Sequence, residues 1–450
     1  MGIIGLWDTI REQDRSFPIA QLAEEHHRIH DRPFRIAVDE ADWQFNNLSE
    51  LKCAGIRETS TEAFQGIQKN MFYRICRLLT LNIHLLFVFD GPRPLVKRGK
   101  RRGGQVDNKK LELLKEMLSY FRIPYHEAPG EAEAECARLQ TLGVVDAVFS
   151  QDSDSLMFGC DFLIRDDRVA KEKGNNNRSK ANTKKDQKCV RVVRGHEIRE
   201  THGFDREGLV LFTMLCGGDY DTTGLPNCGP LMAKRAIQHG LGKSLYRCKT
   251  KADCERWREE LIRWLPKDFY VPSGYPNMRI LKGYSSPTIS TDKQLLDLYK
   301  LWSKTTQPIQ ELNLLTLTSR NFNICGKAYM KWVAPILLTR ALVAKHSSGR
   351  RENAHAIAFI KRRAKKSDEP ESNPLEWRLT FSPFGVMRLT EKDFADVHMI
   401  YGTKIADQLF DPEHRVECEM PKYWLQKVLP LEILSPPTPE PTKASRKRKQ

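Results

Sequence analysis

Three short apolar runs in the first third of the chain have the character of buried strands, and each leads into acidic residues. The runs are residues 35–38 before Asp39, residues 83–89 before Asp90, and residues 146–149 before Asp152 and Asp154. Segments with helical spacing of apolar residues lie between them, such as residues 61–81. This alternation predicts an α/β fold with a parallel or mixed central sheet and helices on both faces. Because parallel strands end at one edge of a sheet, the acids are expected to gather there.

A second group of acids opens the helix predicted before the third run. After Pro129 and Gly130, an alanine-rich segment begins with Glu131, Glu133 and Glu135. Acids are common at helix starts because the helix dipole favours negative charge there. Acids at both a helix start and a strand exit repel one another unless a divalent cation neutralises them. The pattern therefore predicts a Mg²⁺ or Mn²⁺ site, although helical geometry places Glu131 and Glu135 on one face and turns Glu133 away.

A helix, a glycine-bearing hairpin and a second helix are predicted over residues 205–239. The hairpin reads GGDYDTTGLPNCG and contributes another acid, Asp219. Its glycines allow backbone amides to approach a phosphate closely, and the start of the following helix adds its dipole. This element is therefore a candidate for contact with a nucleic-acid backbone.

The rest of the chain divides into a helical region and a β-rich region. Residues 251–345 have helical patterns in which tryptophans are expected to anchor the core, and residues 270–287, rich in Pro, Gly and Ser, are predicted to be a connector. Short strands are predicted at residues 354–360, 375–381 and 386–389, with a helix at 423–428. Residues 435–450 are Pro-rich and then basic, which is typical of a disordered tail.

Charge points to a polyanionic partner. The chain has 450 residues, enough for two or three domains, and a formal net charge of +16 with a pI near 9.3. Such a balance favours nucleic acid as the partner. Basic residues concentrate at 93–110, directly after the second acidic strand end, which favours substrate contact there. A second basic segment, residues 165–194, is expected to be a mobile loop, with solvated surface and substrate contact as equal alternatives.

Composition also excludes several classes of protein. The 11 cysteines contain no CxxC pair, so a zinc site is not expected. No signal-like segment opens the chain, its apolar stretches are too short to span a bilayer, and Leu6 stands where a myristoylation motif requires Ser or Thr. We therefore expect a protein of a reducing intracellular compartment, with no membrane partner.

Several segments together resemble the structure-specific 5′ nucleases of the flap endonuclease and XPG superfamily. In order and spacing these are MGIIGLW, IAVDEADW, FVFDG, GEAEAECARL, SQDSDSLMFG and LCGGDY…GLPNCG, all within residues 1–239. The closest branch resembles the eukaryotic Holliday-junction resolvases, because the segment after the second strand is short and basic, no sliding-clamp-binding motif follows the core, and residues 353–430 are similar to a chromodomain.

The resemblance implies a domain plan. A PIN-like nuclease core is expected over residues 1–345. It would comprise an N-terminal region (residues 1–100), an internal region (residues 120–240) that contains a helix–two-turn–helix at 205–240, and a helical extension (residues 241–345). A chromodomain-like β module is expected over residues 350–430 and a basic disordered tail over 431–450.

The resemblance also implies roles for individual residues. The acids expected to hold two Mg²⁺ ions, with Mn²⁺ as a substitute, are Asp39, Asp90, Glu131, Glu133, Asp152, Asp154 and Asp219. Glu135 lies outside the family's motif and is expected to be structural, whereas Lys97 matches a lysine aimed at the scissile phosphate. DNA contacts are expected at Gly2, Lys97, Arg98, Arg101, Arg102, Gly224, Asn227, Gly229, Lys234 and Arg235, with K⁺ at the hairpin carbonyls. Asn227 and Cys228 stand where the family usually has Gly and an aliphatic residue. The approach of the protein backbone to a DNA phosphate at Asn227 is therefore in doubt.

The activity implied is Mg²⁺-dependent resolution of four-way junctions in the nucleus by paired symmetric nicks, with 5′ flaps and replication forks as further substrates. One active site makes one cut, so two copies are expected on a junction and a monomer without DNA. The alternatives are a 5′ flap endonuclease or 5′ exonuclease, and a non-catalytic branched-DNA scaffold, against which the presence of all seven acids argues. The C-terminal module is expected to contact DNA rather than to read methylated lysine through Trp377, Phe381, Phe384 and Tyr401.

Overall fold

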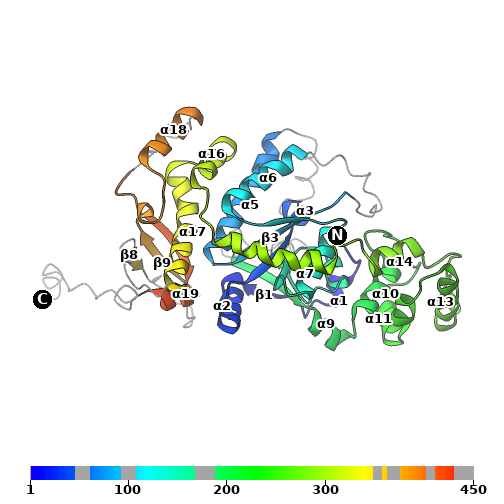
Figure 1. Ribbon diagram of the computed structural model, residues 1–450. Helices are drawn as coiled ribbons and strands as arrows, with labels where there is room; N and C mark the ends of the chain where they lie inside the picture. Colours follow the sequence, from blue (N-terminus) through cyan, green and yellow to red (C-terminus); the bar gives the residue numbers. More distant parts are fainter. Residues whose placement is uncertain are drawn as a thin grey trace, which may run out of the picture. The chain divides into compact units, whose positions relative to one another are not determined.

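The computed structural model describes residues 2–45, 61–92, 108–167, 188–347, 357–361, 375–401 and 411–429 (Figure 1). The chain divides into two compact units. The first contains Met1–Leu22, Arg32–Met71 and Ile83–Pro308, and the second contains Ala23–Asp31, Phe72–Asn82 and Ile309–Gln450. The predicted domain boundaries at residues 345, 350 and 430 stay predictions.

A seven-stranded mixed sheet forms the centre of the first unit. Its strands, in spatial order, are β1 (Arg15–Pro18), β7 (Cys189–Arg194), β6 (Phe162–Asp166), β5 (Ala147–Phe149), β2 (Arg35–Asp39), β3 (His84–Phe89) and β4 (Tyr125–Glu127). Strand β2 pairs in parallel with β3 and β5, whereas β7 is antiparallel to both β6 and β1. The predicted α/β fold and its three acid-bearing strands are therefore confirmed, with those strands at the centre of the sheet.

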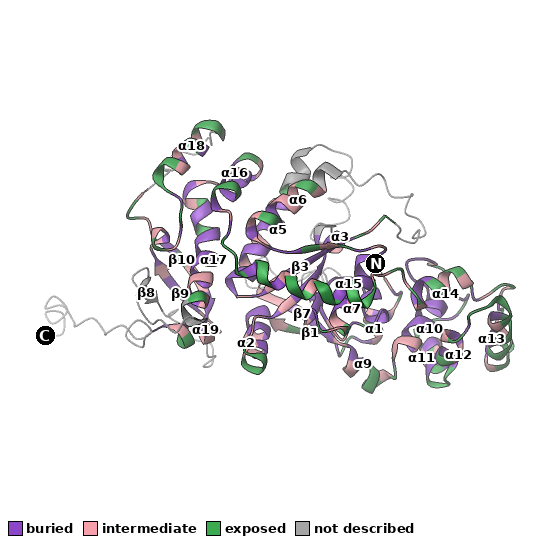
Figure 2. Cartoon of the chain, in the orientation of Figure 1, coloured by how far each residue is buried: buried purple, intermediate pink, exposed green. Residues whose placement is uncertain are grey.

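The apolar character of the central strands follows from burial on both faces. Ile36, Ala37 and Val38 of β2 are fully buried, as expected for a parallel strand covered by helices on each side. The neighbouring strand β3 is likewise almost entirely buried (Figure 2). In register, Asp39 stands opposite Val88, two residues before Asp90, and Val38 stands opposite Phe149. The strand ends that lead into the acids thus meet at one edge of the sheet.

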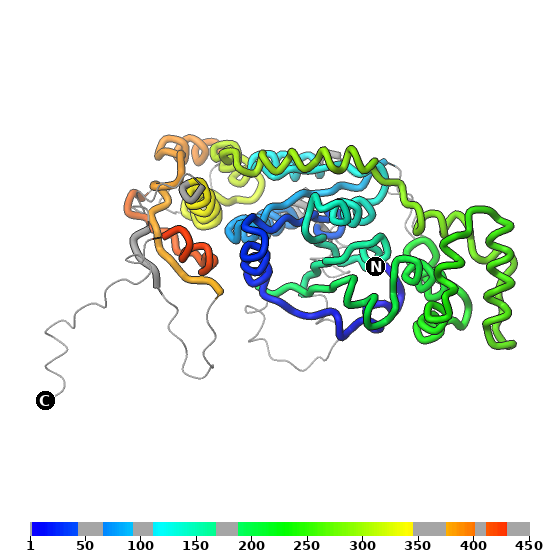
Figure 3. The backbone as a smooth tube through the Cα atoms, turned by 60° about the horizontal axis from the view of Figure 1, so that its bottom comes forward, coloured from blue at the N-terminus to red at the C-terminus, as the bar shows by residue number. Residues whose placement is uncertain are grey.

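Helices surround this sheet and extend beyond it. They are α1 (Leu6–Thr9), α2 (Ile19–His30), α3 (Glu40–Phe45), α5 (Thr61–Thr80), α6 (Asn108–Phe121), α7 (Ala132–Thr141), α8 (Asp154–Met157), α9 (Gly195–His202), α10 (Arg206–Cys216), α11 (Pro230–Gln238), α12 (Leu241–Tyr246), α13 (Lys251–Trp264), α14 (Met278–Ser285), α15 (Asp292–Asp297) and the 3₁₀ helix η2 (Leu298–Thr306). Helices α10 to α14 gather at one side of the unit, next to the N-terminal segment (Figure 3). The helices predicted at residues 61–81, 205–216 and 230–239 are confirmed.

The connector predicted over residues 270–287 is wrong, because it contains helix α14. Pro, Gly and Ser residues precede and follow this helix, so the composition of residues 270–287 resembles that of a loop. The side chain of Asn277 caps its start by accepting hydrogen bonds from the backbone N–H groups of Arg279 and Ile280, at 3.0 and 3.4 Å. Leu281 and Tyr284 bury the face that turns inward.

The second unit contains a three-stranded antiparallel sheet and four helices in its described C-terminal portion. The order of the strands is β10 (Val416–Pro421), β9 (Glu376–Phe381) and β8 (Ile357–Lys361), and the helices are α16 (Glu311–Phe322), α17 (Gly326–Ser347), α18 (Glu391–Tyr401) and α19 (Lys422–Val428). Arg77 forms a bidentate ion pair with Glu376 of β9, at 2.6 and 2.7 Å. The predicted strands that overlap β8 and β9 and the helix at 423–428 are confirmed.

The strand predicted at residues 386–389 is wrong. This segment is irregular chain that follows the short 3₁₀ turn η3 (Pro383–Gly385) and pairs with none of the described strands. Its alternating apolar pattern arises because the side chains of Met387 and Leu389 are both buried. The third strand is β10, and helix α18 was not predicted. Among the described helices, none is both long enough and apolar enough to cross a membrane.

Candidate active site

A chain of hydrogen bonds joins the end of β2 to the turn after β5. Asp39 is buried, and its Oδ2 accepts a hydrogen bond from Ser150 Oγ at 3.0 Å. The same Ser150 Oγ accepts from the backbone N–H of Asp152 at 3.1 Å, and Asp152 Oδ1 accepts from the N–H of Asp154 at 3.0 Å. Three of the predicted site acids therefore belong to one polar network, held at the strand ends by a buried serine.

Asp90 connects the end of β3 to the start of helix α7. Its Oδ1 accepts a hydrogen bond from the backbone N–H of Ala132, the first residue of the helix, at 2.9 Å. This N–H is one of the donors that a helix start leaves unsatisfied. Asp90 thus aligns the acid-bearing end of α7 with the edge of the sheet.

The acids of α7 do not follow the spacing expected from helical periodicity. Glu131 is the N-cap residue in an extended conformation, with φ −85° and ψ 138°, so helical spacing begins only at Ala132. Glu131 Oε2 accepts a hydrogen bond from the Tyr220 hydroxyl at 2.5 Å in a buried position. Glu133 lies close enough to Asp39 to raise the pKa of that carboxyl. Helical geometry by itself would turn Glu133 away from Glu131, but the N-cap conformation of Glu131 removes this objection to the site role predicted for Glu133.

Glu135 is held in a separate contact. Its Oε1 lies 2.7 Å from His126 Nε2, and its Oε2 accepts a hydrogen bond from the backbone N–H of Ser290 at 3.0 Å. The side chain is fully buried. These contacts fit the structural role expected for it.

The N-terminal segment lies between a further acid, Asp219, and Asp152 of the first network. The backbone N–H of Gly2 donates to Asp219 Oδ1 at 2.9 Å, and that of Ile3 donates to Ser153 Oγ at 2.8 Å. Gly2 has a φ of +108°, and a Cβ there would overlap Asp152 Oδ1. Asp219, from the hairpin after α10, and Asp152, from the turn after β5, therefore flank Gly2.

Burial, and secondly the charges of neighbouring acids, disfavours the ionised form of the carboxyl groups in this cluster. Burial raises the pKa of Asp39 well above its usual range, and the neighbouring charges of Glu133, Asp42 and Asp90 add to the effect. Burial likewise raises the pKa of Glu40 to about 8, with Asp90 adding to the shift and Lys115 opposing it. The site is thus an acidic cluster that a cation would stabilise.

Glu40 and Asp42 are acids of the site that sequence reasoning missed. Asp42 Oδ2 accepts a hydrogen bond from the backbone N–H of Gln151 at 2.5 Å, and burial raises the pKa of Asp42 to about 7. The signal was present in the sequence DEAD, which places both acids immediately after the end of β2. Helix α3 begins at Glu40, so both side chains remain near the sheet edge.

The hairpin between α10 and α11 has the backbone conformation that close approach requires. A Cβ at Gly224, which has a φ of +59°, would overlap the Leu215 carbonyl oxygen. Asn227 has a φ of 62°, and asparagine is among the few non-glycine residues that adopt this region readily. The departure from glycine at Asn227 therefore preserves the turn.

The start of α11 supplies the other predicted contacts of this element. Gly229 is its N-cap, and a Cβ there would meet open space. Lys234 Nζ lies 3.2 Å from His202 Nδ1, and Arg235 is exposed. The N-terminus of one short helix and two of its cationic side chains, Lys234 and Arg235, thus belong to the same element.

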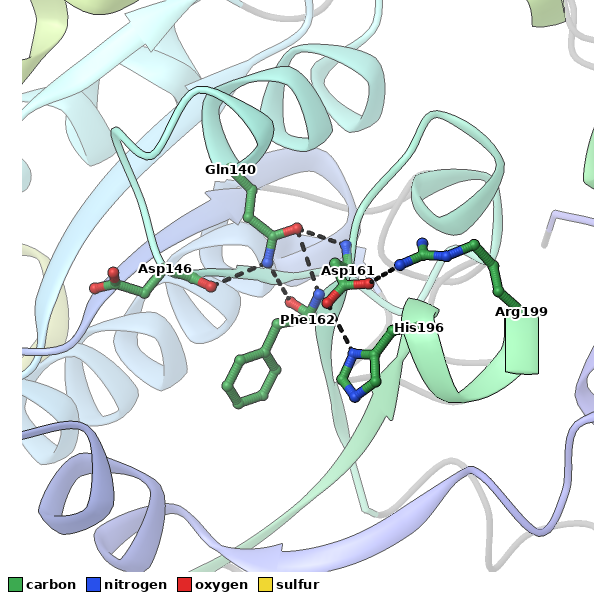
Figure 4. A network of polar contacts seen from close by, with 6 residues as sticks. All are labelled: Gln140, Asp146, Asp161, Phe162, His196 and Arg199. Carbon is green, nitrogen blue, oxygen red and sulfur yellow. Dashed lines mark hydrogen bonds and ion pairs between the residues drawn. The ribbon is translucent and has the colours of Figure 1, made fainter. Parts of the chain in front are cut away.

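The far end of α7 is fixed by a second polar network (Figure 4). Gln140 Nε2 donates to the carbonyl oxygens of Asp146 and Phe162, and its Oε1 accepts from the N–H of Asp161 at 2.7 Å. Asp161 in turn contacts His196 and Arg199 of α9, at 3.0 and 3.1 Å. Both ends of the acid-bearing helix are therefore attached to strand termini.

Two models of a known nuclease family match the part of the chain that carries these acids. The family model for the XPG N-terminal domain matches residues 1–109, and that for the XPG I-region matches residues 122–219. Residues 1–219 therefore carry both regions that define the nucleases of the flap endonuclease and XPG superfamily.

Within this superfamily the chain is similar to resolvases and flap endonucleases. It is 27% identical to Flap endonuclease GEN homolog 1 of Mus musculus over 265 residues, which cover 54% of this chain and 26% of the relative. It is 27% identical to Flap endonuclease 1 of Cryptosporidium muris over 329 residues, which cover 64% of this chain and 63% of that protein. The matched part of the chain thus corresponds to about a quarter (26%) of the length of the mouse GEN homolog.

A solved structure extends the likeness along nearly the whole chain. The Holliday junction-resolving enzyme GEN1 in complex with product DNA and Mg²⁺ is 26% identical and superposes with a TM-score of 0.69, covering 95% of this chain and 97% of that one. The eukaryotic junction-resolving enzyme GEN-1 binding with potassium is 28% identical, with a TM-score of 0.68 and coverage of 96% and 97%.

The oxygen ligands that this XPG-type site offers suit a hard divalent cation. Carboxylate oxygens are the ligands that Mg²⁺ and Mn²⁺ prefer, and a bound cation would offset both the burial and the neighbouring negative charges that raise the pKa of Asp39. As placed, no three His, Cys, Asp or Glu side chains of the described residues form a group that could hold a metal ion.

Four predicted contacts of the superfamily's basic segment cannot be placed. Lys97, Arg98, Arg101 and Arg102 lie outside the described residues, as does most of the second basic segment. The roles proposed for these four cations stay predictions.

Proposed function

We propose that this protein is a Mg²⁺-dependent, structure-specific DNA endonuclease that resolves four-way junctions. The observation that carries the proposal is the gathering of acids from β2, β3, α7, the turn after β5 and the α10 hairpin at one edge of the sheet. The likeness to a junction-resolving enzyme solved with product DNA and Mg²⁺ supports this choice of substrate and ion.

The acids proposed to hold two Mg²⁺ ions are Asp39, Asp90, Glu131, Glu133, Asp152, Asp154 and Asp219, and Mn²⁺ could replace Mg²⁺. Bound there, the ions would supply an activated water and charge stabilisation for the leaving oxygen. Ser150, Tyr220 and the backbone of Gly2 orient three of these carboxylates. Lys97 is proposed to neutralise charge that develops on the phosphate.

The helix–hairpin–helix is proposed to hold the duplex backbone. Its contacts would be the turn at Gly224 and Asn227, the helix start at Gly229, and the cations Lys234 and Arg235. The acidic cluster and the hairpin are joined through Asp219 and Tyr220, so DNA held by the hairpin would lie beside the acids. A K⁺ ion at the hairpin carbonyls is proposed by likeness to the enzyme solved with potassium.

The assembly follows from the chemistry of a junction. Two opposed cuts need two active sites, so we propose that two copies act on one junction and that the protein is monomeric without DNA. The C-terminal unit is proposed to carry a chromodomain-like module that contacts DNA, and the protein is proposed to act in the nucleus. Trp377 and Phe381 are buried within their own unit, which favours a core role over an open cage for methylated lysine.

A comparison of substrates tests the proposed function. The full chain with Mg²⁺ is offered an intact four-way junction, a 5′ flap and a blunt duplex at equal concentration. Paired nicks in the junction at the highest rate are expected. A preference for the flap would support a flap endonuclease, an alternative that the relatives of that name favour. Cleavage of none of them, with either Mg²⁺ or Mn²⁺, would leave a DNA-binding scaffold.

A further inference from the structure

The chain that leaves α14 crosses the start of the acid-bearing helix α7. We call residues 286–290 the strap. A Cβ added at Gly130 would overlap the carbonyl oxygen of Thr288, so the strap lies directly against the residue before Glu131. Further along α7, Glu135 Oε2 accepts a hydrogen bond from the backbone N–H of Ser290 at 3.0 Å. The strap therefore contacts the chain on both sides of Glu131 and Glu133.

Tyr284, near the end of α14 and just before the strap, supports the loop that carries Asp219. Its hydroxyl oxygen accepts a hydrogen bond from the backbone N–H of Tyr220 at 3.2 Å, and the two rings pack with centroids 4.6 Å apart. A Cβ at Gly218 would lie 2.7 Å from the same hydroxyl. Tyr284 is only 1% exposed, so residues 218–220 rest on a fixed, buried side chain.

Tyr220 carries this support to the acidic cluster. Its hydroxyl donates to Glu131 Oε2 at 2.5 Å, and both side chains are buried. A donor of this kind fixes the direction in which a carboxylate presents its oxygens, and such outer partners strongly affect metal affinity. Tyr284, Tyr220 and Glu131 thus form a continuous series of contacts from α14 to the site.

We propose that Tyr220 and Tyr284 are positioning residues that orient Glu131 and Asp219 for divalent-ion binding. The proposal rests on the proposed function, because the ion is the one that the nuclease would use. Both tyrosines lie beyond the residues that the two family models match, which end at 219. Through the strap, helix α14 becomes part of the machinery that sets the geometry of the acids.

The test uses the full chain and Mn²⁺ alone, without DNA, with bound ion measured by electron paramagnetic resonance. Tyr220→Phe removes the donor to Glu131 and keeps the ring on Tyr284. We expect its Mn²⁺ affinity to fall about tenfold or more, as for other outer partners of metal ligands. Tyr284→Phe, which removes the acceptor for the N–H of Tyr220 and leaves the donor to Glu131 in place, should weaken binding by a smaller factor. The Mg²⁺ concentration for half-maximal cleavage should rise in the same order.

Tyr275→Phe is the matched control. This hydroxyl donates to the Met214 carbonyl oxygen of α10 at 3.0 Å, which is a backbone group and not a site acid. Its loss should leave Mn²⁺ affinity unchanged, even if the free energy of unfolding falls as it does in the other two variants.

The outcomes separate the positioning role from the proposed function. If Tyr220→Phe lowers the free energy of unfolding but binds Mn²⁺ like the wild type, the tyrosine is only structural and the proposal is overturned. A wild type that binds no Mn²⁺ overturns it too. If the wild type binds Mn²⁺ with the expected dependence on Tyr220 but cuts no branched DNA, the positioning role stands and the proposed nuclease function fails.

Discussion

At the scale of single residues, Gly2 is a position where the site leaves no room for a side chain. The reasons are its positive φ and its contact with Asp152. Gly2→Ala should displace Asp152 and reduce cleavage by about tenfold or more. Cleavage of a labelled junction measures the effect.

Gly143→Ala provides the control for Gly2. It has a similar positive φ, +72°, but a Cβ there meets nothing within 4 Å. It should cost about 1–3 kcal/mol of stability through backbone strain and leave cleavage unchanged. Equal loss of cleavage in the two variants would show that strain alone, and not contact with Asp152, accounts for the effect.

Asp39→Asn tests the acidic cluster. The amide keeps the shape of the side chain but removes a negative charge that a divalent ion would require, so cleavage should fall by more than about a hundredfold. Junction binding, measured by fluorescence anisotropy in Ca²⁺, should change little. Asp297→Asn, at an exposed acid that forms an ion pair with Lys300, should cut normally. A normal rate for Asp39→Asn would refute the assignment.

At the scale of elements, the hairpin depends on the conformation of Asn227. Asn227→Val places a β-branched residue at a φ of 62° and should lower the free energy of unfolding by about 1–2 kcal/mol, whereas Asn227→Gly should be tolerated. Binding of a plain duplex should weaken for the valine variant. Asn323→Val, at another asparagine with a φ of 53°, is the matched control and should lose stability without losing duplex affinity.

The elements also show where sequence patterns are reliable. The central strands were predictable because burial on both faces requires continuous apolar runs, as in Ile36 to Val38. Helix α14 was not, because its eight residues lie between clusters of Pro, Gly and Ser that are typical of loops. Periodicity argued against Glu133, which the family resemblance placed in the site, because the conformation of Glu131 as an N-cap residue is a local backbone choice that periodicity does not report.

At the scale of the whole molecule, the acidic cluster should link folding to the divalent ion. An ion that binds only the folded chain stabilises it by about 2.7 kcal/mol at a hundred times its Kd. Addition of Mg²⁺ in place of EDTA should therefore raise the Tm measured by differential scanning fluorimetry. Asp152→Asn should lose most of this shift in Tm, because it removes a carboxylate that would bind the ion and also reduces the repulsion among the remaining acids that the ion would relieve. An undiminished shift in that variant would place the ion elsewhere.

The basic segment of the C-terminal unit should contribute to junction affinity. Replacing Arg362, Arg363, Lys365 and Lys366 by Ala should weaken binding and reduce the salt dependence by roughly one unit of slope for each phosphate that is no longer neutralised. The same removal of charge at Arg446, Lys447, Arg448 and Lys449 of the tail is the control. If only the tail variant weakens binding, the module does not hold DNA, and a histone ligand becomes the better hypothesis.

The sequence by itself determined the α/β fold, the central strands and the acids that follow them, because burial and strand ends leave a direct pattern along the chain. It also indicated the glycine-bearing hairpin, since positive φ favours Gly and Asn. Only the tertiary structure decided that Glu40 and Asp42 join the cluster, that Gly2 lies between Asp152 and Asp219, and that Tyr284 supports Tyr220 and Glu131. These contacts join residues far apart in the chain, and their partners are chosen by packing in three dimensions, which no local pattern records.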